Sequence, residues 1–324
     1  MKKYMLALGL SLLTVLGLFT GCSPKAETAS DSDSLKIVAT IFPEYDWVRQ
    51  VLGDRAGEVE LTLLLDSGTD LHSYQPTAAD MLTIGECDLF LYNGGESDAW
   101  VERVLAPAAN PDRRTLSVME VLGDSVLEEE VVEGMQEAED HDHAEGEAHE
   151  EEADEHVWLS LRNARTACAE IARVLGELDP DHAAEYQTNA ENYMAELEAL
   201  DGEYAALAEN AARRTVLVGD RFPFRYLMDD YGLEYYAAFS GCSAETEASF
   251  ETIAFLSGKT EKLALPCILT TESPQPGVAE TIRSNTASGD QTILQLDSMQ
   301  SAGTEDNYLD IMKENLEVLR QALA

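Results

Sequence analysis

Two histidines lie where a folded chain could hold an imidazole rigidly. His72 lies in the loop after the apolar segment LTLLL, near Asp70 and ahead of Pro76, which can start a helix. His156 directly precedes the apolar segment VWLSL, which would anchor it. An imidazole beside carboxylates is a good ligand for a divalent metal ion. Considered alone, His72 could be either a metal ligand or an ordinary surface histidine.

Three other histidines, His141, His143 and His149, lie in a segment that offers no apolar anchor. Residues 128–155 contain fifteen Asp and Glu and no Lys or Arg. Fixing mobile side chains costs conformational entropy, so these imidazoles are poor members of a rigid site. We expect a disordered acidic insertion over about 124–155, whose histidines either capture metal weakly or only add to its solvated charge.

The chain carries a strong excess of negative charge. Its 324 residues include 62 Asp and Glu against 21 Lys and Arg, for a net charge of −41. Such a polyanion repels nucleic acid and anionic lipid, and it attracts cations to concave sites. A hydrophobic content of 45% suffices for a core, and the length suits one large or two medium domains. The composition therefore excludes nucleic acid as a partner and favours a cation.

The N-terminus has the features of an export signal. Two lysines precede an apolar run over 4–19, which is short for a membrane span. We expect a signal peptide over 1–21. The sequence LFTGC resembles the lipobox of bacterial lipoproteins, which makes Cys22 the expected lipidation site. Residues 22–34 would then be a flexible tether at the outer face of the cell membrane, and a plain secretion signal with a chance cysteine is the alternative.

Short apolar segments alternate with helical stretches in two parts of the chain. Near-continuous apolar strands between helices indicate parallel sheets that are covered on both faces. We therefore predict an α/β fold of two lobes, over 35–179 and 213–324, each a mainly parallel sheet flanked by helices. The strands are expected within 35–42, 59–65, 88–95, 114–120, 214–220, 233–241, 265–272 and 291–297.

One long rigid helix is expected to join the two lobes over 180–212. Asp179 suits its N-cap and Pro180 its first position. Apolar residues recur along it at spacings of four and three, which places them on one face of a helix. This face could form a coiled coil, but its alanines and tyrosines favour packing on the same chain and hence a monomer. The face consists of Tyr186, Ala190, Tyr193, Leu197, Leu200, Tyr204 and Leu207.

Besides Cys22, four cysteines could form disulfides in an exported protein: Cys87, Cys168, Cys242 and Cys267. Their spacing shows no paired-cysteine metal motif, so we expect some of them to be buried free thiols. Should one pair form, Cys242 with Cys267 is favoured, because both lie in the second half of the chain.

The stretches TIFPEYDWV, LLDSGTDLHSYQPTAADM, CDLFLYNGGESDAWVE and DEHVWLSLRNA form a distinctive series. They resemble the solute-binding proteins of bacterial zinc and manganese ABC importers. The resemblance extends over nearly the whole chain from Leu35, and it includes the acidic histidine-containing insertion typical of the zinc branch and the long linking helix. It implies that His72 is the first metal ligand and His156 the second.

The resemblance also implies ligands from the second lobe. The zinc branch has its third ligand, a histidine, in a stretch like HDAFGYF, where this chain has GDRFPFRYL. Asp220 matches if one residue is inserted, and otherwise the position falls on Arg221, which cannot bind a metal. The fourth ligand is an acid that matches Glu272. Both carboxylates could instead serve only helix ends. The reserve donors are Glu245, Glu247 and the softer Cys242.

Two neutral histidines and two carboxylates would balance the charge of a divalent ion that joins the lobes. The resemblance implies capture of zinc, with manganese as the alternative, outside the cytoplasm and delivery to the membrane permease of an ABC importer. A smaller number of histidines favours manganese, whereas the general affinity order favours zinc. We expect a binding protein and not an enzyme; a metal-dependent hydrolase and a surface adhesin are the rival classes.

Overall fold

The structure is a computed structural model that describes residues 34–66, 68–106, 110–136, 152–243, 247–272 and 277–324. The chain separates into two units, Met1–Ser34 and Leu35–Ala324, and the second contains every helix and strand described below. The expected signal peptide and the lipidation site Cys22 lie outside the described residues. Within the described ranges, no helix has the length and apolarity that a membrane span requires.

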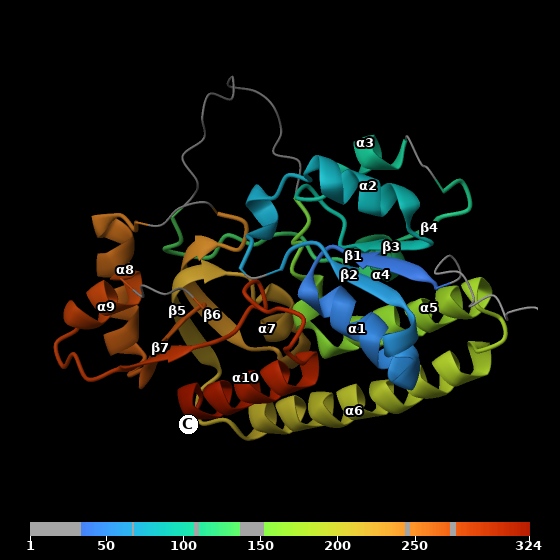
Figure 1. The fold of residues 1–324 in the computed structure, drawn as a ribbon. Coiled ribbons are helices and arrows are strands. Elements are labelled where there is room, and N and C mark those ends of the chain that lie inside the picture. The colour runs from blue at the N-terminus through green and yellow to red at the C-terminus, as the bar shows by residue number, and fades with distance from the viewer. Residues whose placement is uncertain (1–33, 67, 107–109, 137–151, 244–246, 273–276) are drawn as a thin grey trace, which may run out of the picture. The chain divides into compact units, whose positions relative to one another are not determined.

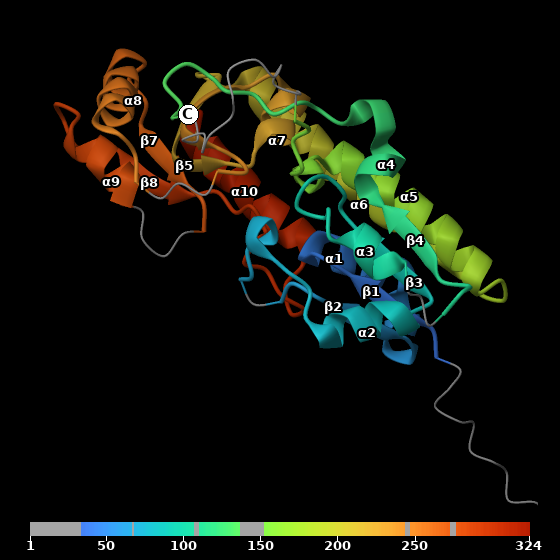
Figure 2. The same cartoon turned by 90° about the horizontal axis from the view of Figure 1, so that it is seen from above.

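Four strands form the first sheet: β1 (Lys36–Ala39), β2 (Glu60–Leu63), β3 (Leu89–Tyr92) and β4 (Arg114–Ser117). All neighbours are parallel, in the order β2-β1-β3-β4. The central strands β1 and β3 are buried almost throughout, as expected for parallel strands that helices cover. The helices of this part, shown around the sheet in Figures 1 and 2, are α1 (Phe42–Leu52), α2 (Ala78–Glu86), α3 (Val101–Leu105) and α4 (Val118–Leu122), with short 3-10 turns η1 (Gly53–Glu58) and η3 (Gly123–Ser125).

Four further strands form the second sheet: β5 (Thr215–Phe222), β6 (Glu234–Ser240), β7 (Cys267–Thr270) and β8 (Thr292–Gln295). They too are parallel, in the order β6-β5-β7-β8. Its helices are α7 (Arg225–Tyr231), α8 (Phe250–Lys262), α9 (Gly277–Ser284) and α10 (Tyr308–Ala322). The α/β prediction of two mainly parallel sheets flanked by helices is therefore confirmed.

The fourth predicted strand is shorter than expected. Residues 114–117 pair in the sheet, but Val118 already begins α4. The side chain of Ser117 accepts a hydrogen bond from the backbone N of Glu120 at 3.3 Å, which caps the helix. An N-cap serine of this kind starts a helix even where the residues after it are β-branched.

Two long helices, α5 (Leu161–Leu178) and α6 (Ala183–Asn210), connect the two sheets along the chain. At 1.5 Å per residue, α6 is about 42 Å long. It packs against α1, α5 and α10 (Figure 1), so its apolar face lies on the same chain, as the sequence predicted. Of the predicted face, all members but Leu207 are buried, and Ala208 takes the place of that residue.

The start of α6 lies three residues after the predicted position. His182 is its N-cap, whereas Asp179 caps the C-terminus of α5. The carboxylate of Asp179 accepts hydrogen bonds from His182 Nδ1 and the Tyr186 hydroxyl, both at 2.7 Å. A carboxylate near a helix start can thus satisfy side chains of the first turn instead of the backbone, and sequence alone does not separate the two cases.

Both flanks of the acidic segment are held in place, which corrects the expectation of a disordered insertion over about 124–155. Leu127 N donates a hydrogen bond to the Tyr226 hydroxyl at 2.9 Å, and this hydroxyl donates to the carbonyl of Asp154 at 2.8 Å. One buried tyrosine of α7 therefore joins the two flanks. The acidic composition of the segment does not indicate that its flanks are held in this way. Residues 137–151, with the three histidines of the segment, lie outside the described residues.

The cysteines Cys87, Cys168, Cys242 and Cys267 are free thiols in the structure. The favoured pairing of Cys242 with Cys267 is therefore wrong. Cys242 follows the last residue of β6, whereas Cys267 is the first residue of β7. The two strands run in the same direction in one sheet, so these residues lie at opposite ends of it.

The last part of the chain returns from the second sheet to the first. Tyr308 N donates to Asp46 Oδ2 at 2.9 Å, and the Tyr308 hydroxyl donates to the carbonyl of Trp158 at 2.7 Å. The ring of Tyr308 contacts Trp47 edge-on, with 5.4 Å between ring centroids. These buried contacts couple the two sheets in addition to α6, which limits how far one can move relative to the other.

The Tyr308→Phe variant should lose about 1–3 kcal/mol of unfolding free energy, because the buried carbonyl of Trp158 loses a hydrogen-bond donor. Urea unfolding followed by circular dichroism measures the change, with Tyr45→Phe at a half-buried position as the control. Equal stability of the Tyr308 variant and the wild type would contradict the coupling described here.

Candidate metal centre

His72 is held by a short 3-10 turn, η2 (Leu71–Ser73), that follows β2 in the chain. Asp70 caps this turn, since its Oδ1 accepts a hydrogen bond from His72 N at 2.9 Å. Leu71 is buried and anchors the turn in the core. The ring atom Nδ1 of His72 lies 2.9 Å from Ser97 Oγ and 3.6 Å from Glu155 Oε2. Both the backbone and the ring of His72 are therefore fixed.

His156 is held by the residues on either side of it. Its backbone N donates to Asp154 Oδ1 at 2.8 Å, and its ring Nδ1 lies 3.0 Å from the same oxygen. The 3-10 turn η4 (Val157–Leu159) follows, and all three of its side chains are buried. His156 itself is 0% exposed. The apolar anchor that the sequence predicted for this histidine is thus present.

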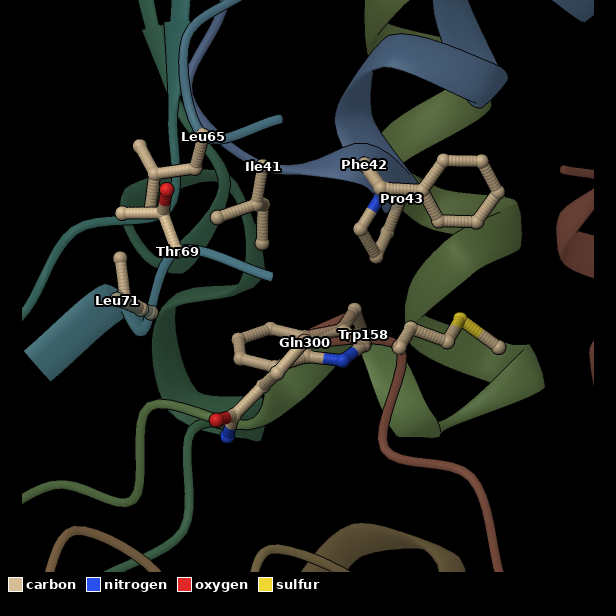
Figure 3. A pocket seen from close by; sticks show the side chains of 9 residues that line it. Ile41, Phe42, Pro43, Leu65, Thr69, Leu71, Trp158 and Gln300 are labelled. Carbon is tan, nitrogen blue, oxygen red and sulfur yellow. The ribbon is translucent and has the colours of Figure 1, made fainter. Parts of the chain in front are cut away.

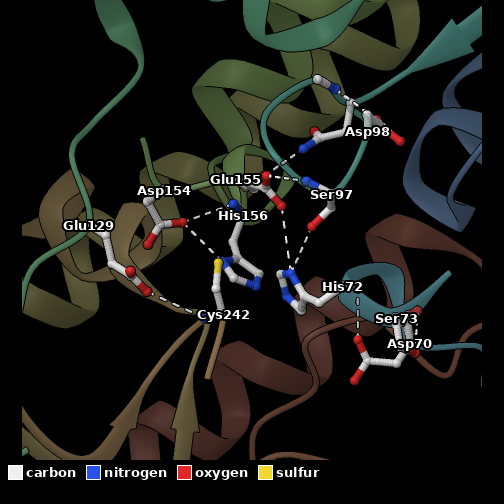
Figure 4. Close-up of polar contacts among 12 residues, drawn as sticks. Asp70, His72, Ser73, Ser97, Asp98, Glu129, Asp154, Glu155, His156 and Cys242 are labelled. Carbon is white, nitrogen blue, oxygen red and sulfur yellow. Dashed lines mark hydrogen bonds and ion pairs between the residues drawn. The ribbon is translucent and has the colours of Figure 1, made fainter. Parts of the chain in front are cut away.

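The two rings lie together, with 5.3 Å between their centroids (Figure 4). Each Nδ1 atom faces an oxygen of a carboxylate or hydroxyl group, as described above. A neutral imidazole with Nδ1–H donating to such an oxygen keeps the lone pair on Nε2. Metal-binding histidines commonly have this arrangement, because the outer hydrogen bond fixes the tautomer and strengthens the ligand.

Both Nε2 atoms, of His72 and of His156, are buried and have no hydrogen-bond partner in the structure. Buried polar atoms are almost always paired in folded proteins, so two unpaired nitrogens in adjacent rings call for an explanation. A metal ion bound by both nitrogens supplies one. The residues present therefore fit a divalent metal ion.

Cys242 joins the two histidines from the second half of the chain. One ligand nitrogen of each imidazole and Sγ of Cys242 lie within 4.8 Å of one another, the only such group of three or more potential ligands among the described residues. Donors around a tetrahedral zinc ion are about 3.5 Å apart, given bonds of about 2.0–2.3 Å. The donors would thus have to approach one another by about an ångström to bind zinc.

Buried carboxyl groups extend from the imidazoles into the first lobe (Figure 4). Glu155 is buried, and its Oε1 accepts a hydrogen bond from Ser97 N at 2.8 Å. Burial, helped by the nearby charge of Glu155, raises the pKa of Asp98 to about 7. Burial likewise raises the pKa of Glu44 to about 8, with Asp98 as the second cause. This surplus of buried acid favours a cation in the centre.

The imidazole of His72 is poised in its neutral form. Burial is the main cause that lowers the pKa of His72 to about 4, and the neighbouring His156 acts in the same direction. The anion of Asp70 opposes the shift, whereas the guanidinium of Arg221 adds to it. At neutral pH the ring therefore offers a lone pair and needs to release no proton when it binds a metal.

Asp220 does not join the imidazoles in this structure. Its Oδ2 accepts hydrogen bonds from Thr271 Oγ1 at 2.8 Å and Thr270 Oγ1 at 3.3 Å, and its Oδ1 accepts from Arg221 N at 2.9 Å. It does not cap the next helix either, since Phe224 is the N-cap of α7. Its carboxylate instead connects β5 to the end of β7. That Asp220 binds metal stays a prediction.

Glu272 is engaged with the segment after β8. Its carboxylate accepts hydrogen bonds from Ser298 N at 2.9 Å, Ser298 Oγ at 2.6 Å and Gln300 N at 3.0 Å. Glu272 lies outside the group of potential ligands around His72 and His156. Its role as the fourth ligand likewise stays a prediction. Of the reserve donors, Glu247 is exposed and Glu245 lies outside the described residues.

Arg221, at the other possible position of the third ligand, forms an ion pair between the two halves of the chain. Its Nη1 lies 3.0 Å from Asp70 Oδ2. The two side chains are 27% and 34% exposed, so solvent screening leaves the pair worth no more than about 1 kcal/mol. It nevertheless places a positive charge of the second lobe beside the turn that carries His72.

Sequence reasoning missed the residues that orient the rings. Asp154 stands two positions before His156, and that short spacing is a signal that could have identified it. Ser97 and Glu155 are distant from His72 in sequence and only the fold brings them to it. Cys242 was considered and ranked below the carboxylates.

A narrow, mostly apolar pocket lies beside the centre, and Trp158 extends from η4 to line it (Figure 3). Trp158 contacts His156 with 5.2 Å between ring centroids, and its Nε1 donates to the carbonyl of Ser298 at 2.9 Å. The indole thereby ties the second histidine to the segment that Glu272 holds. The pocket is lined by Ile41, Phe42, Pro43, Leu65, Thr69, Leu71, Trp158, Met299 and Gln300.

The family model for ZnuA, the zinc-uptake complex component A, periplasmic, matches residues 37–322. The chain belongs to this family. The zinc-binding lipoprotein AdcA of Streptococcus pneumoniae serotype 4 is 31% identical over 324 residues, which are 99% of this chain and 61% of AdcA. The chain thus spans about three fifths of the length of the first curated relatives. The high-affinity zinc uptake system protein ZnuA of Bacillus subtilis is 30% identical over 303 residues, 93% of this chain and 91% of that protein.

Solved structures of ZnuA relatives share the fold. The Zn(II)-bound ZnuA-like domain of Streptococcus pneumoniae AdcA has a TM-score of 0.69 and 28% identity, covering 90% of this chain and 99% of that one. The metal-dependent lipoprotein YcdH of Bacillus subtilis has a TM-score of 0.71 and 26% identity, with the same coverage.

The buried acid Glu44 should make stability depend on pH. Its pKa is raised from 4.5 to about 8 in the folded protein, so between these values the folded chain keeps a proton that the unfolded chain has lost. Stability should therefore fall as the pH rises from about 5 to 8. In urea unfolding experiments the Glu44→Gln variant should show a shallower decline than the wild type, and the raised pKa of Asp98 should account for part of the decline that remains. A decline of the same slope in the variant would show that Glu44 does not contribute.

Proposed function

We propose that this protein captures zinc outside the cytoplasm and delivers it to the membrane permease of an ABC importer. The observation that carries the proposal is the pair of buried, unpartnered Nε2 atoms of His72 and His156, with each Nδ1 atom within hydrogen-bond distance of an oxygen atom. Membership of the zinc-uptake family and the zinc-bound relatives support zinc as the ion.

Capture follows from charge and orientation. The chain has a net charge of −41, which raises the local concentration of cations. Two neutral nitrogens then bind the ion in a site where the surrounding carboxylates offset its charge. Nitrogen donors also favour zinc over manganese in the general affinity order, so manganese is the weaker candidate. The auxiliary histidines His141, His143 and His149 would contribute only weak capture ahead of this site.

Delivery requires that the ion leave the site. A ligand from the second lobe would join the lobes through the ion, and the permease would release it by separating the lobes. The contacts of Tyr308 and α6 restrict that movement, so a small local displacement is the expected one. We expect the protein to act as a monomer, because the apolar face of α6 packs on its own chain.

An N-terminal lipid would hold the protein near its permease. We propose that the signal peptide over 1–21 is removed and that Cys22 is lipidated, so that the protein stays at the outer face of the cell membrane. The description of the family as periplasmic and of AdcA as a lipoprotein supports this location. No feature of the described residues favours hydrolase activity or adhesion.

The variants His72→Ala and His156→Ala should each lower the affinity for zinc by about 100-fold or more, because residues that only orient a ligand already contribute about 10–100-fold. Isothermal titration with a competing chelator measures the affinity, and the wild type should bind one zinc tightly at the centre. His182→Ala is the matched control, since His182 also pairs with a carboxylate but lies at the start of α6. Wild-type affinity in both ligand variants would refute the proposed function.

A further inference from the structure

Among the described residues of the second lobe, Cys242 alone belongs to the group of potential ligands that includes the two imidazoles. β6 ends at Ser240, and the turn after it carries Cys242 into the group of ligand atoms with His72 and His156. No Asp, Glu or other Cys among the described residues joins that group. The group is more than a lone cysteine, because one of its members is the fully buried His156, whose Nε2 has no hydrogen-bond partner.

Gly241 makes this close approach possible. A Cβ atom on residue 241 would lie only 2.7 Å from Cε1 of His156, closer than real Cβ contacts are. The backbone N of Cys242 donates to Glu129 Oε1 at 3.4 Å, so the flank of the acidic segment holds the turn from its other side. The turn is therefore fixed against the ring of His156.

The other candidates from the second lobe have partners elsewhere. Asp220 accepts hydrogen bonds from Thr271 and its neighbour, and Glu272 holds the segment after β8. Both carboxylates would have to give up these bonds before they could serve the metal centre. Sγ of Cys242 already lies within 4.8 Å of a ligand nitrogen of each imidazole.

We propose that Cys242 is the third metal ligand and that its thiolate makes the centre selective for zinc over manganese. This inference rests on the metal capture proposed above. When the ion binds, Sγ exchanges its S–H bond for an S–metal bond, and the proton passes to solvent. The exchange changes no oxidation state. The ion then has two neutral nitrogens from the first lobe and one anionic sulfur from the second.

The sulfur ligand determines which metal ion the centre prefers. Thiolate is a soft ligand that suits zinc, whereas manganese prefers oxygen ligands. A cysteine in place of the third histidine therefore keeps a zinc preference that an aspartate would weaken. A bond to Cys242 also joins the lobes directly, so the ion itself would hold them together.

Cobalt(II) is the probe for the first test, because thiolate ligation gives it an intense charge-transfer band in the near ultraviolet. We expect this band in the cobalt-loaded wild type and in Cys267→Ser, a matched control for a cysteine of the same lobe outside the ligand group. We expect no band in Cys242→Ser, and an affinity for zinc lowered by at least about tenfold. A band that persists in Cys242→Ser, or that is absent from the wild type, would overturn the inference.

Selectivity is the second readout. In Cys242→Asp, the ratio of zinc affinity to manganese affinity should fall relative to the wild type, and an unchanged ratio would overturn the selectivity role.

Zinc-edge X-ray absorption of the wild type needs no variant to fold, and it should show one sulfur scatterer beside nitrogen. Zinc bound through His72 and His156 without sulfur would end this inference and leave the proposed function standing, whereas zinc affinity that is insensitive to both histidines would end the proposed function.

Discussion

The hydrogen bonds to the two Nδ1 atoms are the interactions on which the metal centre depends. Asp154 holds the ring of His156 and Ser97 holds that of His72, with Glu155 Oε2 3.6 Å from the same nitrogen of His72. An Nδ1–H that donates to these oxygens leaves the free lone pair on Nε2. The fold serves this arrangement: a capped 3-10 turn beyond β2 carries one ring, and an anchored turn before α5 carries the other.

Charge and burial explain why such a centre needs a cation. Burial keeps the imidazole of His72 neutral and raises the pKa values of Asp98 and Glu44. The centre therefore holds unpaired nitrogens and several acids whose ionised forms are disfavoured. A divalent ion would supply the missing partner to the nitrogens and offset the negative charge at once. The buried groups that lower stability in the absence of a metal ion would thus favour binding of the ion.

Much of the fold could be predicted because it rests on local patterns. Continuous runs of apolar residues predicted the strands of both sheets, and the spacing of apolar residues predicted the buried face of α6. The helix start after Ser117 was missed because a single capping hydrogen bond marks it. The helix start at His182 was missed because Asp179 bonds side chains of the first turn instead of its backbone. The histidines of the centre could be predicted from their anchors. The nearness of Cys242 could not, because it depends on how the turn after β6 packs against His156.

The most direct test of the account is a crystal structure of the zinc-loaded protein, with the ion located by its anomalous scattering. One zinc ion should be bonded to Nε2 of both His72 and His156 at about 2.0–2.1 Å. The Nδ1 atoms should still face Asp154, Ser97 and Glu155. Zinc bonded through Nδ1 of either histidine, or bound away from this pair of rings, would contradict it.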